Sequence, residues 1–269
     1  GLDFTNQMSG VKKIGNTMIV ALNGFAKGAQ LTRAEILFDS QTYKPFDYCA
    51  ELVPVMVNQI EADGGCAKIV SDYLRKLDAI MNQVIAVSDV YLKRPFNEET
   101  NFGNLIADYM LRAASAEVAL QNAGSFRADI EAGDVTVGDV YNALPFDNDI
   151  VLLEVPGKVL YDVINTTCRR ERGLLQISGA SYSYDPNIAQ SDVNADVITR
   201  LSVAGEEIQL NRKYRVATNG FLASGQGGYP QLKKCPLIGS YDNLREASMR
   251  FMREDKVLNP IIEGRITRA

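Results

Sequence analysis

The chain has 269 residues, of which 46% are hydrophobic and 23% are charged, and its formal net charge is −5. This composition indicates a folded protein of one or two domains. The acidic balance argues against a nucleic-acid polymer as partner, because binding to a phosphate backbone relies on clustered Lys and Arg. The chain contains no histidine, which excludes the usual catalytic triads, histidine-bridged dinuclear metal centres and imidazole acids or bases within it.

The sequence carries no stretch of eighteen apolar residues, so we expect no membrane-spanning helix. Its amino end begins at Gly1 and lacks the basic-then-apolar layout of a signal peptide, and we expect a processed or trimmed product. Four cysteines form no C-x-x-C pair, which argues against a zinc ribbon or a thioredoxin-type site. They are Cys49, Cys66, Cys168 and Cys235. A Cys49–Cys66 disulfide and free buried thiols both stay open.

Residues 1–45 predict a small stranded piece. Short strands are expected over 17–22 and 33–38, and a glycine-bearing stretch over 23–28 separates them. Such a pair of strands alone is barely stable in water.

A long helical region is predicted after the polar breaker Asp39–Pro45. Apolar side chains between Ile69 and Met81 recur at helical spacing, and Gly64-Gly65 is expected to divide the region into two helices. A helical region between a small stranded piece and a larger block is typical of an interdomain connector. Residues 46–83 are therefore predicted to be connector helices.

From Val84 onward, short strands and helices alternate, which predicts a mixed α/β domain, an α+β sheet with flanking helices. The expected helices cover 103–115, 157–170 and 241–253, and the expected strands cover 117–121, 149–155, 197–203 and 213–218. The last two strands are expected to form an antiparallel pair around Ala204-Gly205.

Three loops mix glycine with polar or aromatic side chains. The first, Asn122–Arg127, places an amide and a guanidinium around a glycine turn, a pairing that suits one ligand with a hydrogen-bonding group and an anion. The second, Leu144–Asn148, holds Phe146 at a loop tip behind a proline. The third, Asn219–Pro230, is rich in glycine but lacks the Lys-Ser/Thr of a phosphate-binding P-loop. Each segment by itself also fits an ordinary turn.

Taken in order, several segments resemble the carboxy-terminal domain of 5′-nucleotidases, as in the bacterial periplasmic nucleotidase/UDP-sugar hydrolase and 2′,3′-cyclic-nucleotide phosphodiesterase type. They read Glu-Thr-Asn-Phe-Gly-Asn-Leu-Ile-Ala-Asp over 99–108, Asn-Ala-Gly-Ser-Phe-Arg over 122–127, Ile-Glu-Ala-Gly-Asp-Val over 130–135, Leu-Pro-Phe over 144–146, and the glycine-rich stretch over 221–230. The resemblance covers 84–269 and implies a substrate-binding domain there. Residues 11–40 more loosely resemble the closing strands of the family's amino-terminal metallophosphatase domain, so residues 1–45 are expected to be remnant strands of that domain.

The resemblance implies a division of labour between two domains. In the family, the amino-terminal domain holds two divalent metals and performs the hydrolysis, while the carboxy-terminal domain binds the nucleoside between two phenylalanines. Carried over by motif, the stacking pair is Phe146 and Phe221, the base-facing amide is Asn122, and Arg127 is directed at the phosphate. Asn101 and Gly225 complete the substrate-binding set. No catalytic or metal-binding residue, and no cofactor, is expected in this chain.

The chain departs from the family's pattern at several positions. Gly227 replaces an aspartate that holds the ribose hydroxyls, and hydrogen bonds to such a charged group contribute about 1.5–3 kcal/mol. The family's Asn-Gly-Gly-Gly-Ile-Arg is here Asn-Ala-Gly-Ser-Phe-Arg, and Asn101 and Asn104 stand where some members place arginines that contact phosphate. Ligand affinity or identity is therefore open.

Two functional hypotheses follow from the sequence. In the first, the chain is the nucleoside-recognition domain of a 5′-nucleotidase-type hydrolase, located in the periplasm or at the cell surface, which partners its own metallophosphatase domain and alone hydrolyses no nucleotide. In the second, it is a binding or interaction module that kept the fold and lost nucleotide recognition. A third alternative, an unrelated enzyme using Asp108, Asp147 and Asp149, is weaker because lone acidic residues at element ends usually are solvated or cap helices.

Overall fold

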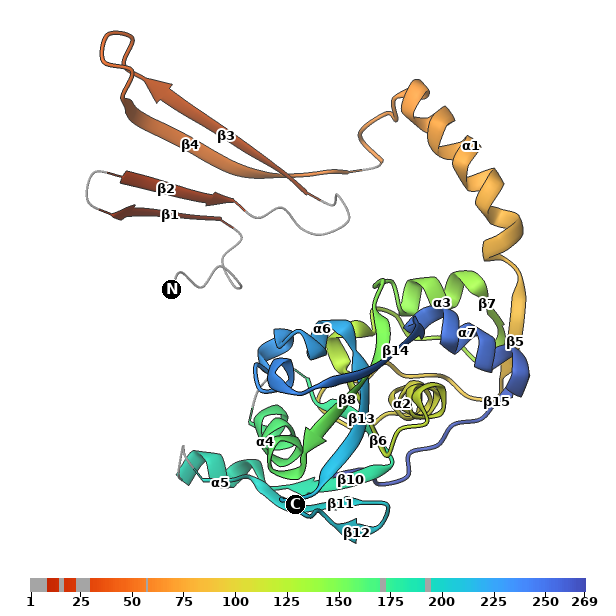
Figure 1. Cartoon of the computed structure of the whole chain (residues 1–269). Coiled ribbons are helices and arrows are strands. Elements are labelled where there is room, and N and C mark those ends of the chain that lie inside the picture. Colours follow the sequence, from red (N-terminus) through yellow and green to blue (C-terminus); the bar gives the residue numbers. More distant parts are fainter. Residues whose placement is uncertain (1–8, 15–16, 23–29, 57, 170–172, 192–194) are drawn as a thin grey trace. The chain divides into compact units, whose positions relative to one another are not determined.

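The computed structural model (Figure 1) describes residues 9–14, 17–22, 30–56, 58–169, 173–191 and 195–269. The glycine-bearing stretch predicted over 23–28 lies outside them. By its internal contacts the chain divides into two compact units, Gly1–Leu74 and Arg75–Ala269.

The described residues of the first unit include two antiparallel strand pairs. Strand β1 (Ser9–Ile14) pairs with β2 (Thr17–Leu22), and β3 (Gln30–Phe38) pairs with β4 (Pro45–Pro54). The predicted strands over 17–22 and 33–38 are thus confirmed, each with its own partner. Leu31 of β3 and Phe46 of β4 are more than 60% exposed.

The prediction of two connector helices over 46–83 is wrong in two respects. Its first part is a strand, and a single helix follows. Residues 45–54 form β4, because backbone pairing with β3 runs from Gln30–Pro54 to Phe38–Pro45. One helix follows, α1 (Gly64–Met81), which begins at the two glycines instead of breaking there. Its start is set by Asp63, whose Oδ1 accepts the backbone N–H of Cys66 at 2.8 Å, as an N-capping carboxylate does.

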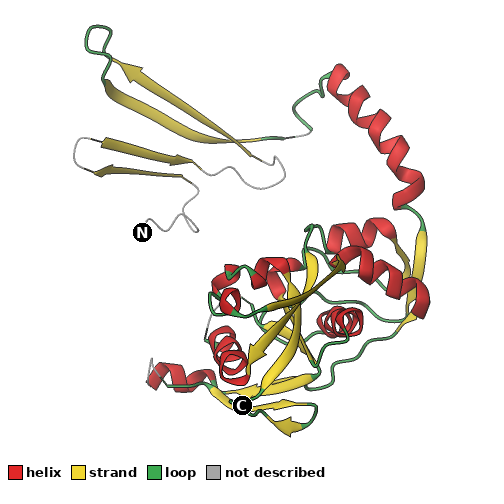
Figure 2. Cartoon of the chain, viewed as in Figure 1, coloured by secondary structure: helices red, strands yellow, loops and turns green. Residues whose placement is uncertain are grey.

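The second unit alternates strands and helices, so the predicted mixed α/β class is confirmed (Figure 2). Its elements are β5 (Val84–Ser88), α2 (Asn101–Ala114), β6 (Val118–Asn122), β7 (Gly133–Thr136), α3 (Val137–Ala143), β8 (Asp149–Pro156), α4 (Gly157–Cys168), β9 (Leu175–Ser178), β10 (Ala180–Tyr184), α5 (Pro186–Ser191), β11 (Ile198–Val203), β12 (Glu206–Glu207), β13 (Lys213–Asn219), α6 (Gly220–Ala223), β14 (Leu237–Asn243), α7 (Leu244–Asp255), β15 (Val257–Leu258) and β16 (Ile266–Arg268).

A five-stranded mixed sheet lies at the centre of the second unit, in the order β14-β8-β13-β6-β9. Strand β13 runs parallel to β6 and antiparallel to β8. Successive side chains of a strand point to opposite faces, and each face of this sheet has its own core. Ala119 belongs to the core with α2, α3 and α7, whereas its neighbours Val118 and Leu120 belong to the core with α4, β10 and β11.

The predicted antiparallel pair of 197–203 and 213–218 is wrong. A hairpin turn does lie at Ala204-Gly205, where both residues have positive φ (50° and 84°), as a two-residue hairpin loop of this kind requires. The turn joins β11 to the short strand β12, and β13 instead enters the central sheet between β6 and β8.

Helices α2 and α4 confirm the predictions over 103–115 and 157–170. The last helix starts at Leu244 and not at Tyr241, because residues 237–243 form β14 beside β8 and Asn243 caps the helix. Helix α2 also sits close to β9: a Cβ on Gly103 would lie 2.2 Å from Gln176 Oε1. Gln176 accepts the backbone N–H of Thr100 and donates to the carbonyl of Glu98, which anchors the start of α2.

Candidate functional site

Three of the loops singled out in the sequence meet at one edge of the central sheet. The parallel strands β6 and β13 both end there, at Asn122 and Asn219, and the antiparallel strand β8 begins there. Asn219 lies opposite Ile150 in the register of β13 and β8. Strand pairing therefore brings the segments that carry Asn122, Phe146 and Phe221 to the same place, although nearly one hundred residues separate the first from the last.

The Asn122 turn is held by its own side chains and by its neighbours. A short 3-10 helix, Ala123–Ser125, follows β6. Ser125 Oγ donates to Asn122 Oδ1 at 2.7 Å, and Asn219 Nδ2 donates to the same oxygen at 2.8 Å. Asn122 is half-buried, so its amide borders solvent while its oxygen is fixed from within the fold.

Arg127 and Phe146 lie next to each other. The backbone N–H of Arg127 donates to the carbonyl of Ala143 at 2.8 Å, which ties the Asn122 turn to the end of α3. The guanidinium carbon of Arg127 is 5.2 Å from the centre of the Phe146 ring, within cation–π range. Phe146 is 43% exposed, so part of its ring is open to solvent or to a ligand.

Phe221 lies on α6, a single helical turn that directly follows β13. It is partly buried against the core that includes α4 and β10. Gly227 lies against its ring: a Cβ there would be 3.0 Å from Phe221 Cε1, and the residue has φ +67°. Gly225 has φ +84°, and a Cβ there would be 3.2 Å from Pro230 Cα, so the tight turn itself calls for glycine.

The loop that carries Phe146 is clamped by the start of α7. Arg245, whose side chain is 11% exposed, donates to the carbonyl of Leu144 and to Asp147 Oδ1, each at 3.3 Å. Asn243 Nδ2 donates to Asp147 Oδ1 at 2.8 Å, and the backbone N–H of Leu244 donates to Asn148. The residues on both sides of Phe146 are thus fixed by one helix terminus.

Replacing Arg245 with Met should therefore loosen the Phe146 loop. The change keeps most of the aliphatic stem but removes the donors to Leu144 and Asp147, and leaving a buried carbonyl unpaired costs about 1–2 kcal/mol. We expect the free energy of unfolding in urea to fall by that amount, and nucleoside affinity, measured by isothermal titration calorimetry, to fall about 3- to 10-fold, equal to about 0.7–1.4 kcal/mol.

Arg250→Met is the matched control for this variant. Arg250 is on the same helix and lies over Phe251, but its side chain is 50% exposed and it pairs with Asp242. Exposed pairs contribute little, so stability and affinity should stay near those of the unchanged chain. Unaltered nucleoside affinity in a destabilised Arg245→Met protein would contradict the positioning role of Arg245.

The side chain of Asn101 has internal partners. Its Nδ2 donates to the carbonyl of Tyr91 at 2.8 Å, and its Oδ1 accepts the backbone N–H of Lys93 at 3.1 Å. Asn104 is 2% exposed and donates to Glu99 and to the carbonyl of Ile261. These asparagines hold the segments around α2 together, and a ligand contact by Asn101 stays a prediction.

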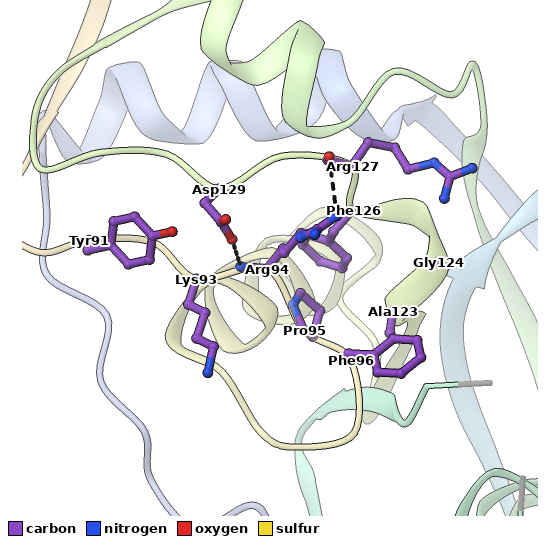
Figure 3. Close-up of a pocket in the computed structure, with 10 residues that line it drawn as sticks. All are labelled: Tyr91, Lys93, Arg94, Pro95, Phe96, Ala123, Gly124, Phe126, Arg127 and Asp129. Carbon is purple, nitrogen blue, oxygen red and sulfur yellow. Dashed lines mark hydrogen bonds between the residues drawn. The ribbon is translucent and has the colours of Figure 1, made fainter. Parts of the chain in front are cut away.

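A cavity of about 620 Å³ opens beside the Asn122 turn (Figure 3). Residues 91–96 and 123–129 contribute its lining, and Arg127 is the one member of the predicted substrate-binding set among them. The backbone N–H of Arg94 donates to Asp129 Oδ1 at 2.8 Å, and its guanidinium reaches the carbonyl of Arg127. In Figure 3 the Arg127 guanidinium extends away from Arg94 and Phe96.

The cavity carries charges of both signs. Lys93 pairs with Glu98, and a hydrogen bond to Asp129 raises the pKa of Tyr91. Apart from Arg127, sequence reasoning missed this cavity, because Lys93 and Arg94 lie in a segment without glycine or periodicity. It likewise missed the contacts that position the sheet-edge loops, such as those of Arg245 and Asn219, since they join residues far apart in the chain.

The described residues show two further features. Among them, no three Cys, Asp or Glu side chains lie together in a way that could hold a metal ion. In the same part of the chain, each helix is too short or too polar to span a bilayer.

The second unit is thus a mixed α/β domain with glycine-rich and aromatic loops gathered at one edge of its central sheet. The chain belongs to the 5′-nucleotidase, C-terminal domain family, whose model matches residues 80–234. This confirms the resemblance seen in the ordered sequence segments.

Individual relatives agree with this assignment. The chain is 29% identical over 253 residues to "Endonuclease YhcR" of Bacillus subtilis, covering 91% of this chain and 20% of that protein. It is 28% identical over 183 residues to a 5′-nucleotidase of Vibrio vulnificus, covering 66% of this chain and 32% of that protein. The crystal structure of a 5′-nucleotidase precursor from Thermus thermophilus is similar with a TM-score of 0.68 and 30% identity, covering 97% of this chain and 54% of that one. The chain thus spans between a fifth and about half of the length of these relatives.

Proposed function

We propose that this domain binds a nucleoside or nucleotide at the sheet edge, with the base stacked between Phe146 and Phe221. The observation that carries the proposal is the convergence of Asn122, Arg127, Phe146 and Phe221 at one edge of the central sheet, from loops that are distant in sequence. An aromatic face is worth about 1–3 kcal/mol per stacked base. Two faces would supply about 2–6 kcal/mol of the roughly 8 kcal/mol of a micromolar complex.

The polar residues have separate roles in this proposal. The amide of Asn122 hydrogen-bonds the edge of the base, and the guanidinium of Arg127 faces the phosphate, for which its planar fork of donors is suited. Because the guanidinium carbon of Arg127 lies 5.2 Å from the centre of the Phe146 ring, the two side chains are close enough to contact one ligand.

Phosphoester hydrolysis would require a second domain. The chain has no histidine, and its described residues do not fit a dinuclear metal centre. We therefore propose that the two metals are held by an amino-terminal metallophosphatase domain, with which this domain acts in nucleotide catabolism in the periplasm or at the cell surface. The role of the present residues is to bind and orient the substrate.

The test is isothermal titration of the 269-residue chain with adenosine, uridine and their monophosphates. We expect binding of at least one nucleoside at micromolar to submillimolar concentration, and no release of phosphate from the monophosphates with any divalent metal. A folded protein that binds none of them at millimolar ligand would overturn the proposal, and metal-dependent turnover by pure chain would overturn the division of labour between domains.

Gly227→Asp should introduce a preference for ribose. In the family's pattern an aspartate at this position accepts hydrogen bonds from the sugar hydroxyls, and one such bond to a charged group contributes about 1.5–3 kcal/mol. Part of this gain is offset because φ is +67° and the new Cβ would press on the Phe221 ring. We expect the ratio of ribonucleoside affinity to 2′,3′-dideoxynucleoside affinity to rise about tenfold.

Measuring this ratio on one protein separates ribose recognition from any loss of stability. Gly227→Asn is the control, since it has nearly the same shape and the same tolerance of positive φ but no charge. A ratio that stays unchanged in Gly227→Asp would show that the sugar lies elsewhere.

A further inference from the structure

Asn219 stands at the end of β13, fully buried, with both ends of its side-chain amide engaged. Its Oδ1 accepts the backbone N–H of Leu222 at 2.9 Å, the N-capping contact of α6. A backbone N–H can only donate, so this contact fixes which end of the Asn219 amide is oxygen. The orientation therefore follows from the backbone and not from a choice between amide rotamers.

The position of the Asn219 side-chain nitrogen then determines the orientation of the Asn122 amide. Nδ2 donates one hydrogen to Gln121 Oε1 at 2.7 Å and the other to Asn122 Oδ1 at 2.8 Å. If the Asn122 amide were turned over, two NH₂ groups would face each other at hydrogen-bond distance. The hydroxyl of Ser125 also donates to Asn122 Oδ1, which gives this oxygen two internal donors.

The nitrogen of Asn122 is left for something outside this network. None of the hydrogen bonds among the described residues uses Asn122 Nδ2, and a Cβ on Gly124 would be 3.5 Å from it. Gly124 thus adds no side chain beside this NH₂ group, and Asn122 as a whole is half-buried.

We infer that Asn219 is a positioning residue that holds Asn122 with its NH₂ group toward the ligand, so that the site selects a base with a hydrogen-bond acceptor at that edge. This inference rests on the proposed function, since it assigns the polarity of the same site. The acceptor is a ring nitrogen or an exocyclic carbonyl oxygen. A base that presents only N–H or C–H there leaves the NH₂ group unpaired or opposed, and we expect it to bind about tenfold more weakly or worse.

The orientation is testable without a ligand. In the free 269-residue chain, hydrogen exchange of side-chain amides followed by NMR should show slow exchange for the Asn219 NH₂ group and fast exchange for that of Asn122. In Asn219→Asp at pH 8, the new carboxylate still caps α6 and has no donor, so the Asn122 amide should turn over and its NH₂ group should become protected. Protection of the Asn122 NH₂ group in the unchanged chain would overturn the inference.

The selection of a base with a hydrogen-bond acceptor is tested with adenosine and its 1-, 3- and 7-deaza analogues. Each analogue replaces one ring nitrogen by C–H. In the unchanged chain, calorimetry should show one analogue bound at least tenfold more weakly than adenosine. In Asn219→Asp this difference should fall to less than threefold. Equal binding of adenosine and all three analogues by the unchanged chain, or undiminished discrimination in Asn219→Asp, would overturn the inference.

Gln121→Glu is the matched control, because it makes the same change from amide to carboxylate in the same buried cluster. Gln121 Nε2 has no hydrogen-bond partner among the described residues, and its Oε1 still accepts from Asn219 after the change. Asn122 should keep its orientation and the analogue discrimination should stay. Loss of discrimination in Gln121→Glu would contradict a specific role for Asn219. If no nucleoside binds the unchanged chain, the proposed function fails, while the exchange rates still decide the orientation of Asn122.

Discussion

Replacing either Phe146 or Phe221 with alanine is expected to weaken nucleoside binding by about 1–3 kcal/mol, which is about 5- to 150-fold in the dissociation constant. Each variant removes one face of the proposed aromatic clamp. Calorimetric titration with adenosine or uridine, whichever the unchanged chain binds more tightly, is the measurement. In the double variant we expect no binding detectable below millimolar ligand.

The two variants should differ in stability. Phe146 is 43% exposed at a loop tip, so its removal should change the free energy of unfolding by less than about 1 kcal/mol. Phe221 packs against a core and against Gly227, so its removal should cost more. A loss of affinity in Phe146→Ala is therefore the cleaner result, because it cannot be attributed to unfolding.

Phe96→Ala is the control for both. Phe96 is 58% exposed and lines the cavity of Figure 3, near the Asn122 turn, but it is outside the proposed clamp. Its replacement should leave nucleoside affinity within about twofold. If all three variants bind as the unchanged chain does, or if only Phe96→Ala loses affinity, stacking between Phe146 and Phe221 is wrong. If Phe146→Ala and Phe221→Ala show near-normal stability and no change in nucleoside affinity, the result would favour an interaction module that lost nucleotide recognition.

Local pattern was sufficient to predict much of the second unit. Helix α2 has an apolar stripe of period 3.6 and a capping threonine, and β6 and β8 are short apolar runs between turns, so neighbouring residues determine them. The hairpin at Ala204-Gly205 was predicted for the same reason. The strand that pairs with β11 was not predicted correctly, because pairing depends on packing between segments that are distant in sequence. Strand β13 lies in the central sheet and contributes side chains to the cores on both of its faces.

The first unit shows the error of extending a helical prediction beyond its periodic residues. The helical spacing covers residues 69–81, but the predicted helical region began at residue 46, and residues 46–54 lie in β4, which pairs with β3 along its whole length. A short apolar run fits either a strand or part of a helix, and only the partner decides. The capping role of Asp63 was a local signal that predicts the true start of α1 and was overlooked.

The residue types of the candidate site could be predicted from the sequence. The contacts that hold its loops in place could not. The ordered segments pointed to Asn122, Arg127, Phe146 and Phe221, and strand order brings all four to one edge. The support comes from Asn219 and Arg245, whose side chains act across about one hundred residues of sequence. No spacing rule finds such contacts, since they depend on how β13 and α7 pack.

Glu99 illustrates how a residue in a recognisable segment acts in folding. It begins the segment 99–108, on which the family resemblance partly rested. Its side chain is buried, with the residue 6% exposed, and contacts the carboxy-terminal segment. Its Oε1 accepts from Asn104 Nδ2 and the backbone N–H of Glu263, each at 2.7 Å, and its Oε2 accepts the backbone N–H of Ile266 at 3.0 Å. One carboxylate thus joins the first turn of α2 to the segment leading into β16.

We expect Glu99→Ala to lower the free energy of unfolding by about 3–5 kcal/mol, the largest loss of stability among these variants. The reason is that three donors lose a charged acceptor; such bonds contribute about 1.5–3 kcal/mol each, and water that enters the space left by the side chain offsets part of the sum. Urea denaturation measures the loss, and backbone hydrogen exchange should be faster at Glu263 and Ile266 even where the rest of the protein stays folded.

The neighbouring residue provides the control. Glu98 is exposed and pairs with Lys93 at the surface, so Glu98→Ala should change stability by less than about 1 kcal/mol. Glu99→Gln keeps the oxygen that accepts from both Asn104 and Glu263, while its NH₂ group would face the backbone N–H of Ile266, and we expect about half of the loss. If Glu99→Ala were as stable as the unchanged chain but bound no nucleoside, Glu99 would be a ligand contact. If it lost stability while its folded fraction bound normally, the segment 99–108 would serve the fold, and recognition would belong to the sheet-edge loops alone.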